Sequence, residues 1–332
     1  MSLEITKISS ASQLPEEWDS MATGYFQTTS FLGYTEKYNS CNQRYYVLKD
    51  GGSCKSGIII YSLDLDLFTF LPFARSMKMN ISGIPCSVSN GGFVGDKRFL
   101  EELLLHVTKI EKGLTLCLNL DRNLKIKGFA SGVTLPSIVF RNRYNSWENY
   151  LSCLRSPYRR RIKLFSDRFK VIVKKNLSCR DFSEEMYSQY RDVHKRSKGK
   201  LETLSNDFFV NLPEDFYLSA FYLESRLLGW HIVLHAENNR SFFMGGIDYQ
   251  FNKEYRVYFN MLIDILKEGI DAGVQEIDFG QTAETPKLRL GGDVVEKYMI
   301  GSHSGSVFRK LLNIGSSFLE YKGRFVTNNV LK

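Results

Sequence analysis

The pattern of apolar and polar positions predicts paired strands in two parts of the chain. Apolar runs at 45–48 and 57–61 flank a turn that contains two glycines, and runs at 218–223 and 229–235 flank a short polar turn. Short apolar runs rich in β-branched and aromatic residues on both sides of turn residues are typical of β-hairpins. The sequence therefore predicts one hairpin in each half of the chain.

The same order of elements follows each predicted hairpin. Apolar residues at helical spacing predict helices over 99–111 and 258–271. Gly113 and Gly273 come next, where a helix often ends in a left-handed residue, and a strand follows each glycine. This weak internal repeat predicts an α/β protein with two similar halves. We expect an N-terminal domain over 1–145 and a C-terminal domain over 146–332, the latter ending in a helical segment.

A basic segment opens the second half. Ser146 is placed as the N-cap of a short helix, and a second helix is expected after Pro157. That second helix carries Tyr158, Arg159, Arg160 and Arg161. Guanidinium groups clustered in this way can bind phosphates, because each offers paired donors that match phosphate oxygens. The alternative is a solvated basic helix whose aromatic and aliphatic residues face the core.

Composition and charge narrow the class of protein. The chain has 332 residues, is 43% hydrophobic and 24% charged, and has a formal net charge of +8 at pH 7. These values exclude a disordered chain and favour an anionic partner such as a phosphorylated co-substrate, RNA or an acidic membrane. The six cysteines show no metal-ligand spacing, so we expect reduced thiols and no metal site. No signal peptide is recognised at the start, so a cytoplasmic protein is expected.

Two residues are candidates for proton transfer. Asp248 ends a predicted strand that leads through a polar loop into the helix at Tyr258. It is the first candidate for a general base, and its alternative role is capping a helix or turn. His231 shares a strand face with His235 and could move a proton near neutral pH, although a histidine on a strand is more often packed or exposed.

The string DFGQTAETPKLRLGG at 278–292 resembles the C-terminal signature of FemAB-like tandem GNAT acyltransferases. The basic segment SWENYLSCLRSPYRRRIKLFSDRF, the hairpin with LLGWHIVLH and FFMGGIDY, and the N-terminal YFQTTSFLGYTEKY also resemble parts of that family. The resemblance covers most of the chain, and it is specific at the C-terminal motif and loose elsewhere.

The resemblance implies a fold and an activity. The fold would be two tandem GNAT-like domains, each a mixed, mostly antiparallel sheet flanked by helices. The activity would be transfer of an acyl or aminoacyl group to an amine in cell-envelope or natural-product biosynthesis. The donor, acyl-CoA or a carrier thioester or aminoacyl-tRNA, would be a co-substrate and not a tightly bound cofactor. The acceptor would be a small-molecule, peptide or lipid-linked amine.

The matched motif also implies residues that bind the donor. These are Gln281, Lys287 and Arg289, of which the last two could hold an anionic group of the donor or acceptor. Arg256 and Tyr258, at the entrance of the preceding helix, are further candidates for donor contacts, although aromatic packing explains the tyrosine equally well. The loop before that helix lacks the glycine-rich phosphate pattern of single-domain GNAT enzymes, which puts ordinary acetyl-CoA binding in doubt.

Two alternatives to catalysis stay open. One is a catalytically inactive GNAT-fold binding module. The other is a tRNA- or RNA-binding protein that uses the basic segment; stable DNA binding is not expected. The segment from Val307 onward is amphipathic and basic, so it could rest on the inner face of an acidic membrane or pack as a terminal helix.

Overall fold

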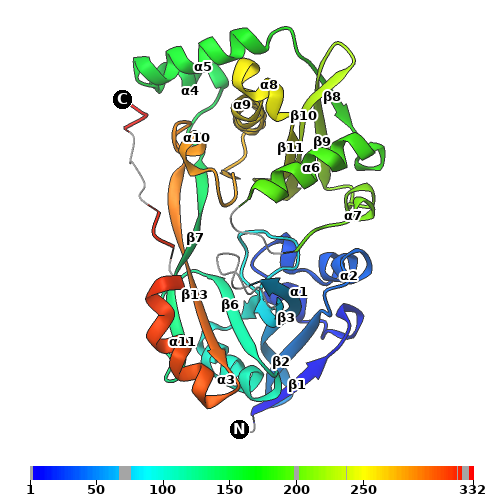
Figure 1. The fold of residues 1–332 in the computed structure, drawn as a ribbon, viewed down its shortest axis with the longest axis vertical. Coiled ribbons are helices and arrows are strands. Elements are labelled where there is room, and N and C mark those ends of the chain that lie inside the picture. Colours follow the sequence, from blue (N-terminus) through cyan, green and yellow to red (C-terminus); the bar gives the residue numbers. More distant parts are fainter. Residues whose placement is uncertain (1–2, 67–75, 198–201, 237, 320, 324–328) are drawn as a thin grey trace. The chain divides into compact units, whose positions relative to one another are not determined.

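The chain folds into two units that each contain a β-sheet with helices on both faces (Figure 1). The first unit comprises Met1–Leu135 and Glu296–Lys322, and the second comprises Pro136–Val295 and Gly323–Lys332. The structure is a computed structural model that describes residues 3–66, 76–197, 202–236, 238–319, 321–323 and 329–332.

The first unit has the strand order β1-β2-β3-β4-β6-β13, with the short β5 beside β3. In that order β4 and β6 run parallel, and the other neighbours run antiparallel. Its elements are β1 (Leu3–Ile8), α1 (Trp18–Met21), α2 (Thr29–Tyr38), β2 (Arg44–Asp50), β3 (Ser53–Asp66), β4 (Ser76–Ser82), β5 (Phe93–Gly95), α3 (Leu100–Ile110), β6 (Leu114–Leu120), β7 (Ala130–Arg141), β13 (Asp293–His303) and α11 (Ser306–Leu319).

The second unit has the strand order β7-β12-β11-β10-β9-β8. Here β11 and β12 run parallel, and the other neighbours run antiparallel. Its elements are α4 (Trp147–Cys153), α5 (Ser156–Phe169), β8 (Val173–Leu177), α6 (Glu184–Arg196), α7 (Asn206–Val210), β9 (Phe216–Leu223), β10 (Arg226–Ala236), β11 (Asn239–Ile247), α8 (Tyr249–Tyr255), α9 (Val257–Asp271), β12 (Glu276–Asp278) and α10 (Glu284–Leu288).

The repeat predicted from the sequence is present in both units. Each has an antiparallel hairpin, β2–β3 or β9–β10, followed later by a helix, a glycine and a strand. The glycines, Gly113 and Gly273, have φ angles of 92° and 69°, the left-handed values expected where a helix ends. In each unit the strand after the glycine pairs parallel with an earlier strand, β6 with β4 and β12 with β11. The predicted mixed, mostly antiparallel α/β fold is therefore confirmed.

The units divide the chain differently from the expected ranges 1–145 and 146–332. Strands β7 and β13 each begin in one unit and end in the other. β13 pairs antiparallel with β6, from Tyr298 opposite Leu120 to His303 opposite Leu114. These backbone hydrogen bonds place the end of β13, and the helix α11 that follows it, in the first unit.

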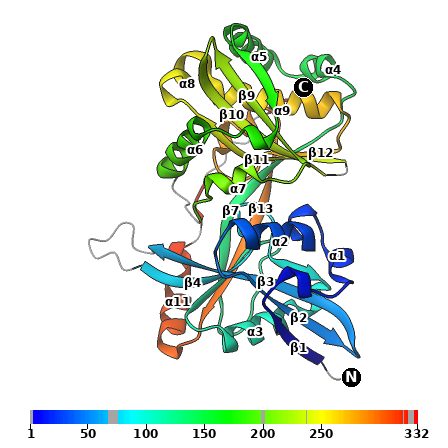
Figure 2. The ribbon, with the colours of Figure 1, turned by 90° about the vertical axis from the view of Figure 1, so that its right-hand side faces the viewer.

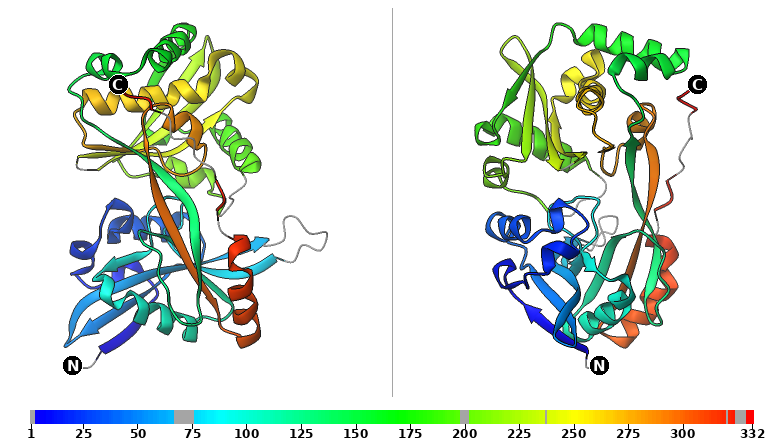
Figure 3. Two further views of the ribbon diagram at one scale, coloured as in Figure 1. Left: turned by 90° about the vertical axis from the view of Figure 1, so that its left-hand side faces the viewer. Right: turned by 180° about the vertical axis from the view of Figure 1, so that it is seen from behind.

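Helices cover both faces of the sheet in the second unit (Figures 2 and 3). On one face, Trp230 of β10 is fully buried and its indole Nε1 donates to the carbonyl oxygen of Met186 in α6, at 3.0 Å. On the other face, buried aliphatic residues of α9 pack with α4, β7 and β12. Each buried aliphatic or aromatic side chain contributes about 1.5–3 kcal/mol. The sheet is therefore a rigid support for residues at its strand ends.

Gly246 of β11 lets α6 lie close to the sheet. A Cβ atom at this position would be 2.4 Å from Nε1 of Trp230 and 2.9 Å from Cβ of Gln189. Neither neighbour is the free end of a flexible side chain. The glycine is therefore required by the close approach of the helix.

The terminal helix α11 is amphipathic, as the sequence predicts. Leu312 packs against a core cluster of the first unit. Four apolar side chains of the same helix are exposed: Val307, Phe308, Leu311 and Ile314. Contact of this helix with a membrane stays a prediction. Among the residues that the structure describes, no helix has both the length and the apolar character needed to cross a bilayer.

All six cysteines are free thiols, and five of them are buried. This agrees with the expected reduced state.

Candidate active site

Strands β11 and β12 are paired over three residues and then separate. Their parallel register runs from Asn239 opposite Glu276 to Ser241 opposite Asp278. Beyond Asp278 the chain stays with β7, since the N–H of Phe279 donates to Ile138 at 2.9 Å. From 242 to 247, β11 has β10 as its one strand partner among the described residues. One edge of β11 is therefore open and can pair with amide groups of a ligand.

The open strand ends at Asp248, which is the N-cap of α8. Its Oδ1 accepts from the N–H of Gln250 at 2.9 Å, and its Oδ2 accepts from Arg226 Nη2 at 2.9 Å. The structure thus shows the capping role that the sequence left open. The Asp248 side chain is 17% exposed, so its carboxylate can also be reached by a ligand.

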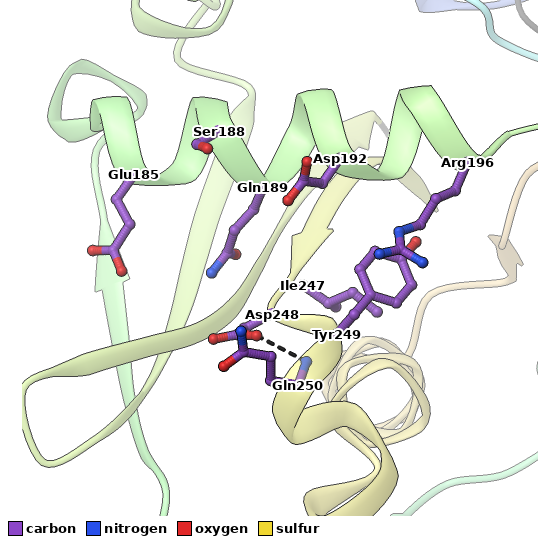
Figure 4. A pocket seen from close by; sticks show the side chains of 9 residues that line it. All are labelled: Glu185, Ser188, Gln189, Asp192, Arg196, Ile247, Asp248, Tyr249 and Gln250. Carbon is purple, nitrogen blue, oxygen red and sulfur yellow. Dashed lines mark hydrogen bonds between the residues drawn. The ribbon is translucent and has the colours of Figure 1, made fainter.

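Asp248 lines a pocket of about 300 Å³ between α6 and the start of α8 (Figure 4). Side chains of α6 form one wall, at positions spaced three or four residues apart on one face of the helix. The lining residues are Glu185, Ser188, Gln189, Asp192, Arg196, Ile247, Asp248, Tyr249 and Gln250. The α6 residues of this lining were not predicted from the sequence. The sequence contains a signal for them, because polar residues of α6 recur every three or four positions, whereas Met186 and Tyr190 are buried.

A basic surface lies beside the start of α9. Arg159 and Arg160 of α5 are exposed, and Arg161 lies over the ring of Tyr158, 5.8 Å from its centroid. One turn after Arg161, Phe165 lies under the guanidinium of Arg256, at 5.4 Å. The structure therefore brings Arg256 to the same helix as the arginines predicted to bind a polyanion.

Arg256 separates α8 from α9 and has a left-handed backbone, with φ 52°. Two residues further along, the backbone N–H of Tyr258 donates to Oδ1 of Asn252 at 3.1 Å. The Tyr258 side chain is partly buried among the core residues of α9, and burial raises the pKa of its hydroxyl. This packing is the alternative role of Tyr258, and its contact with a donor stays a proposal.

His231 does not lie with Asp248. It is fully buried on the face covered by α9, and its Nε2 lies 3.0 Å from Oδ2 of Asp264. A carboxylate can only accept, so Nε2 carries the proton. Burial lowers the pKa of His231, which favours the neutral ring. A catalytic role with Asp248 in one cleft does not agree with this placement.

The histidine belongs to a network that joins three strands to α9. Lys174 of β8 pairs with Asp264 at 2.7 Å and also with Glu268, one turn further along α9. Glu268 pairs in turn with Arg240 of β11, which is 3% exposed. Burial alone would raise the pKa of Asp264, but its histidine and lysine partners outweigh burial and lower it. The network holds α9 against the sheet.

Lys287 supports a turn and does not face a ligand. It is 1% exposed, and its Nζ donates to the carbonyl oxygens of Gly280, Gln281 and Thr282 at 3.1, 2.7 and 2.7 Å. Burial lowers the pKa of Lys287 to about 7. The expected anion contact is therefore not available at Lys287. Arg289 is exposed at the end of α10 and Gln281 is half-buried in the supported turn, so both stay proposals.

Comparison with known proteins identifies one domain and a similar fold. Residues 153–288 match the family of acetyltransferase (GNAT) domains. The crystal structure of FemX has a similar fold, with a TM-score of 0.56, 12% sequence identity, and coverage of 90% of this chain and 98% of that one. A comparison with curated protein sequences finds no match.

Two further solved structures are similar. A tandem GNAT protein from the clavulanic acid biosynthesis pathway has 9% identity over 92% of this chain and 99% of that one, with a TM-score of 0.49. The structure of L-PGS from Bacillus licheniformis has 10% identity over 86% of this chain and 94% of that one, with a TM-score of 0.49.

The matched domain and the open edge of β11 lie in the same unit, and the strand and helix order is repeated in the other. The chain contains an acetyltransferase (GNAT) domain at 153–288, which supports an acyltransferase. It has the FemX-like, tandem GNAT fold, so the resemblance to FemAB-like proteins is confirmed.

Proposed function

We propose that the second unit transfers an aminoacyl group from tRNA to the nitrogen of an amine. The observation that carries this proposal is the exposed arginine surface of α5, which continues to Arg256 at the start of α9. The start of α9 follows the open strand β11 along the chain, with α8 between them. A polyanion bound by α5 would therefore be held near the strand end where Asp248 lies.

The local backbone favours a tRNA over a compact pyrophosphate. A pyrophosphate at a helix start needs free N–H groups and a backbone that it can approach closely. Here α8 precedes α9, the residue at the junction is Arg256, and the N–H of Tyr258 is used by Asn252. The exposed arginines of α5 instead suit a ligand with phosphates spread along a chain.

An acyl-CoA donor is the second candidate. The match of 153–288 to acetyltransferase domains favours it. The acyl thioester would use the same open edge of β11, with its phosphates at Arg256.

The chemistry asks little of the protein beyond positioning and proton transfer. The neutral amine attacks the carbonyl carbon of the ester, a C–N bond forms, and the C–O bond to the ribose breaks. Asp248 is proposed to take the proton that the amine loses, and this proton then goes to the leaving ribose oxygen. An N–H group of the open β11 edge would stabilise the developing oxyanion.

The test is binding of fluorescently labelled tRNA at several salt concentrations, followed by fluorescence anisotropy with coenzyme A as competitor. We expect affinity to fall steeply with salt, because bound cations are released from the phosphates. The double variant Arg159→Glu/Arg160→Glu should abolish binding. Arg122→Glu/Lys127→Glu, which changes two exposed residues of the first unit by the same charge, should retain it.

A turnover assay then follows the binding assay. Consumption of aminoacyl-tRNA with an amine present would support an enzyme and exclude both an inactive binding module and a protein that only binds RNA. Absence of tRNA binding, with acyl-CoA consumed instead, would replace the first donor by the second. Consumption of neither donor would refute the proposal. The acceptor is expected to be a small-molecule, peptide or lipid-linked amine.

A further inference from the structure

The pocket between α6 and α8 carries an excess of negative charge. Three carboxylates line it, those of Glu185, Asp192 and Asp248. Glu185 and Asp192 form no ion pair with the described residues, and Asp248 pairs with Arg226. The basic residue in the lining, Arg196, stacks on the ring of Tyr249 at 4.2 Å. The lining therefore leaves carboxylate oxygens free for a positively charged ligand.

A buried amide points to the same kind of ligand. Gln189 is 8% exposed, and its Nε2 donates to the carbonyl oxygen of Leu227 at 3.0 Å. This bond fixes the amide so that Oε1 is an acceptor, and Oε1 has no hydrogen-bond partner among the described residues. A buried acceptor without a partner costs about 1–3 kcal/mol. Figure 4 shows the Gln189 side chain extending from α6 toward Asp248.

The arrangement fits an organic cation and not a metal ion. Among the described residues, no three carboxylate, histidine or cysteine side chains converge closely enough to hold a metal. The carboxylates are instead spread around a cavity of about 300 Å³, with the Gln189 amide on the α6 wall. An ammonium or guanidinium group has several N–H donors, so it can satisfy an amide oxygen and carboxylates together.

We propose that this pocket binds the acceptor of the reaction, and that the acceptor carries a second cationic group besides the amine that is acylated. The inference rests on the proposed function, since it names the acceptor of the same site. Glu185 and Asp192 keep the bound nitrogen charged, because opposite charge favours the charged form, and Asp248 is left to take the proton of the second amine. A charged ammonium has no lone pair for attack. The nitrogen in the pocket is therefore the anchor, and a second, neutral amine outside it is acylated.

Binding of 1,5-diaminopentane to the full chain tests the proposal without any donor. Calorimetry should show binding at least tenfold tighter than that of the neutral isostere 1,5-pentanediol, and weaker binding at high salt. The double variant Glu185→Gln/Asp192→Asn should weaken diamine binding about tenfold, as expected for two partly exposed ion pairs. Glu254→Gln removes an exposed carboxylate of α8 outside the pocket and should bind like the unchanged protein.

Gln189→Leu should weaken diamine binding as well, with a thermal unfolding scan to show that the variant is folded. Equal binding of the diamine and the diol would overturn the proposal, and so would a diamine affinity that both variants leave unchanged. If the diamine binds but no donor acylates it, the proposed function fails and the cation site stands. If amines are acylated while diamine binding is insensitive to the pocket variants, the function stands and this inference fails.

Discussion

Replacing Lys287 by methionine tests how the turn after β12 is held. In the folded chain burial lowers the pKa of Lys287 to about 7, against a usual value of 10.5. Between these two pH values the unfolded chain binds one proton more than the folded chain. Unfolding therefore becomes more costly as pH rises through this window, and the effect is complete near pH 10.5.

The size of this effect follows from the two pKa values. Each pKa unit corresponds to about 1.4 kcal/mol, so the whole window is worth roughly 5 kcal/mol. Between pH 7 and pH 9 the linkage relation gives a gain of about 2 kcal/mol. Urea unfolding at both pH values should show this gain for the unchanged protein. Lys287→Met should lack it, and Arg289→Met, at an exposed neighbouring position, should keep it.

The substitution should also loosen the turn. Thr282 and Ala283 have left-handed backbones, with φ angles of 59° and 47°, at a cost of about 1–2 kcal/mol each. The three bonds from Lys287 to the carbonyls of 280–282 hold this conformation. The reasoning would be refuted if stability depended on pH in the same way in Lys287→Met and in the unchanged protein. That result would mean that the three carbonyl oxygens fully offset the effect of burial on the pKa of Lys287.

Four further substitutions test the packing of the two units. Gly246→Ala should lower the free energy of unfolding by roughly 1–3 kcal/mol, because the added methyl group would meet the buried indole of Trp230. The control is Gly33→Ala in α2, where the nearest atom to the added methyl group is 4.0 Å away. This variant should raise the free energy of unfolding by up to about 1 kcal/mol. Asp264→Ala should cost about 3 kcal/mol in urea unfolding, because the fully buried His231 and the partly buried Lys174 would lose their partner; a cost below 1 kcal/mol would contradict the network. Burial raises the pKa of Glu111, but hydrogen bonds led by Arg44 outweigh it and lower the pKa to about 2. The stability that Glu111 contributes is present above pH 4.5 and is lost as pH falls toward 2. Arg44→Met should therefore unfold at a higher pH than the unchanged protein in an acid titration followed by circular dichroism. An unchanged midpoint would exclude the Arg44–Glu111 pair as the cause.

Hydrophobic periodicity and turn residues predicted the helices and strands, because these elements depend on residues that are neighbours along the chain. The hairpins, the helix before Gly273 and the Ser146 cap were all predicted, and Ser146 Oγ accepts from the N–H of Asn149 at 3.1 Å. The repeat and the motif at 278–292 together predicted the tandem fold. The basic character of α5 was also readable, since arginines need no tertiary partner to stay exposed.

Which side chains meet is decided by long-range packing, which local pattern does not contain. The shared strand face of His231 could be predicted, but whether that face meets solvent, a ligand or α9 could not. Two acidic positions four apart on one face of a mainly apolar helix, Asp264 and Glu268, were the local sign of a buried network. Lys287 likewise reads as a free cation in the sequence, and it is buried because the turn folds back over it.

The sequence by itself determined the class of fold, the tandem order of the elements and the excess of positive charge. The tertiary structure alone decided that Asp248 faces a pocket walled by α6, that Gln189 presents an unpaired acceptor there, and that His231 lies on the opposite face. The physical reason is that helix and strand periods fix the face of a side chain, whereas its neighbours depend on which distant segments pack against that face.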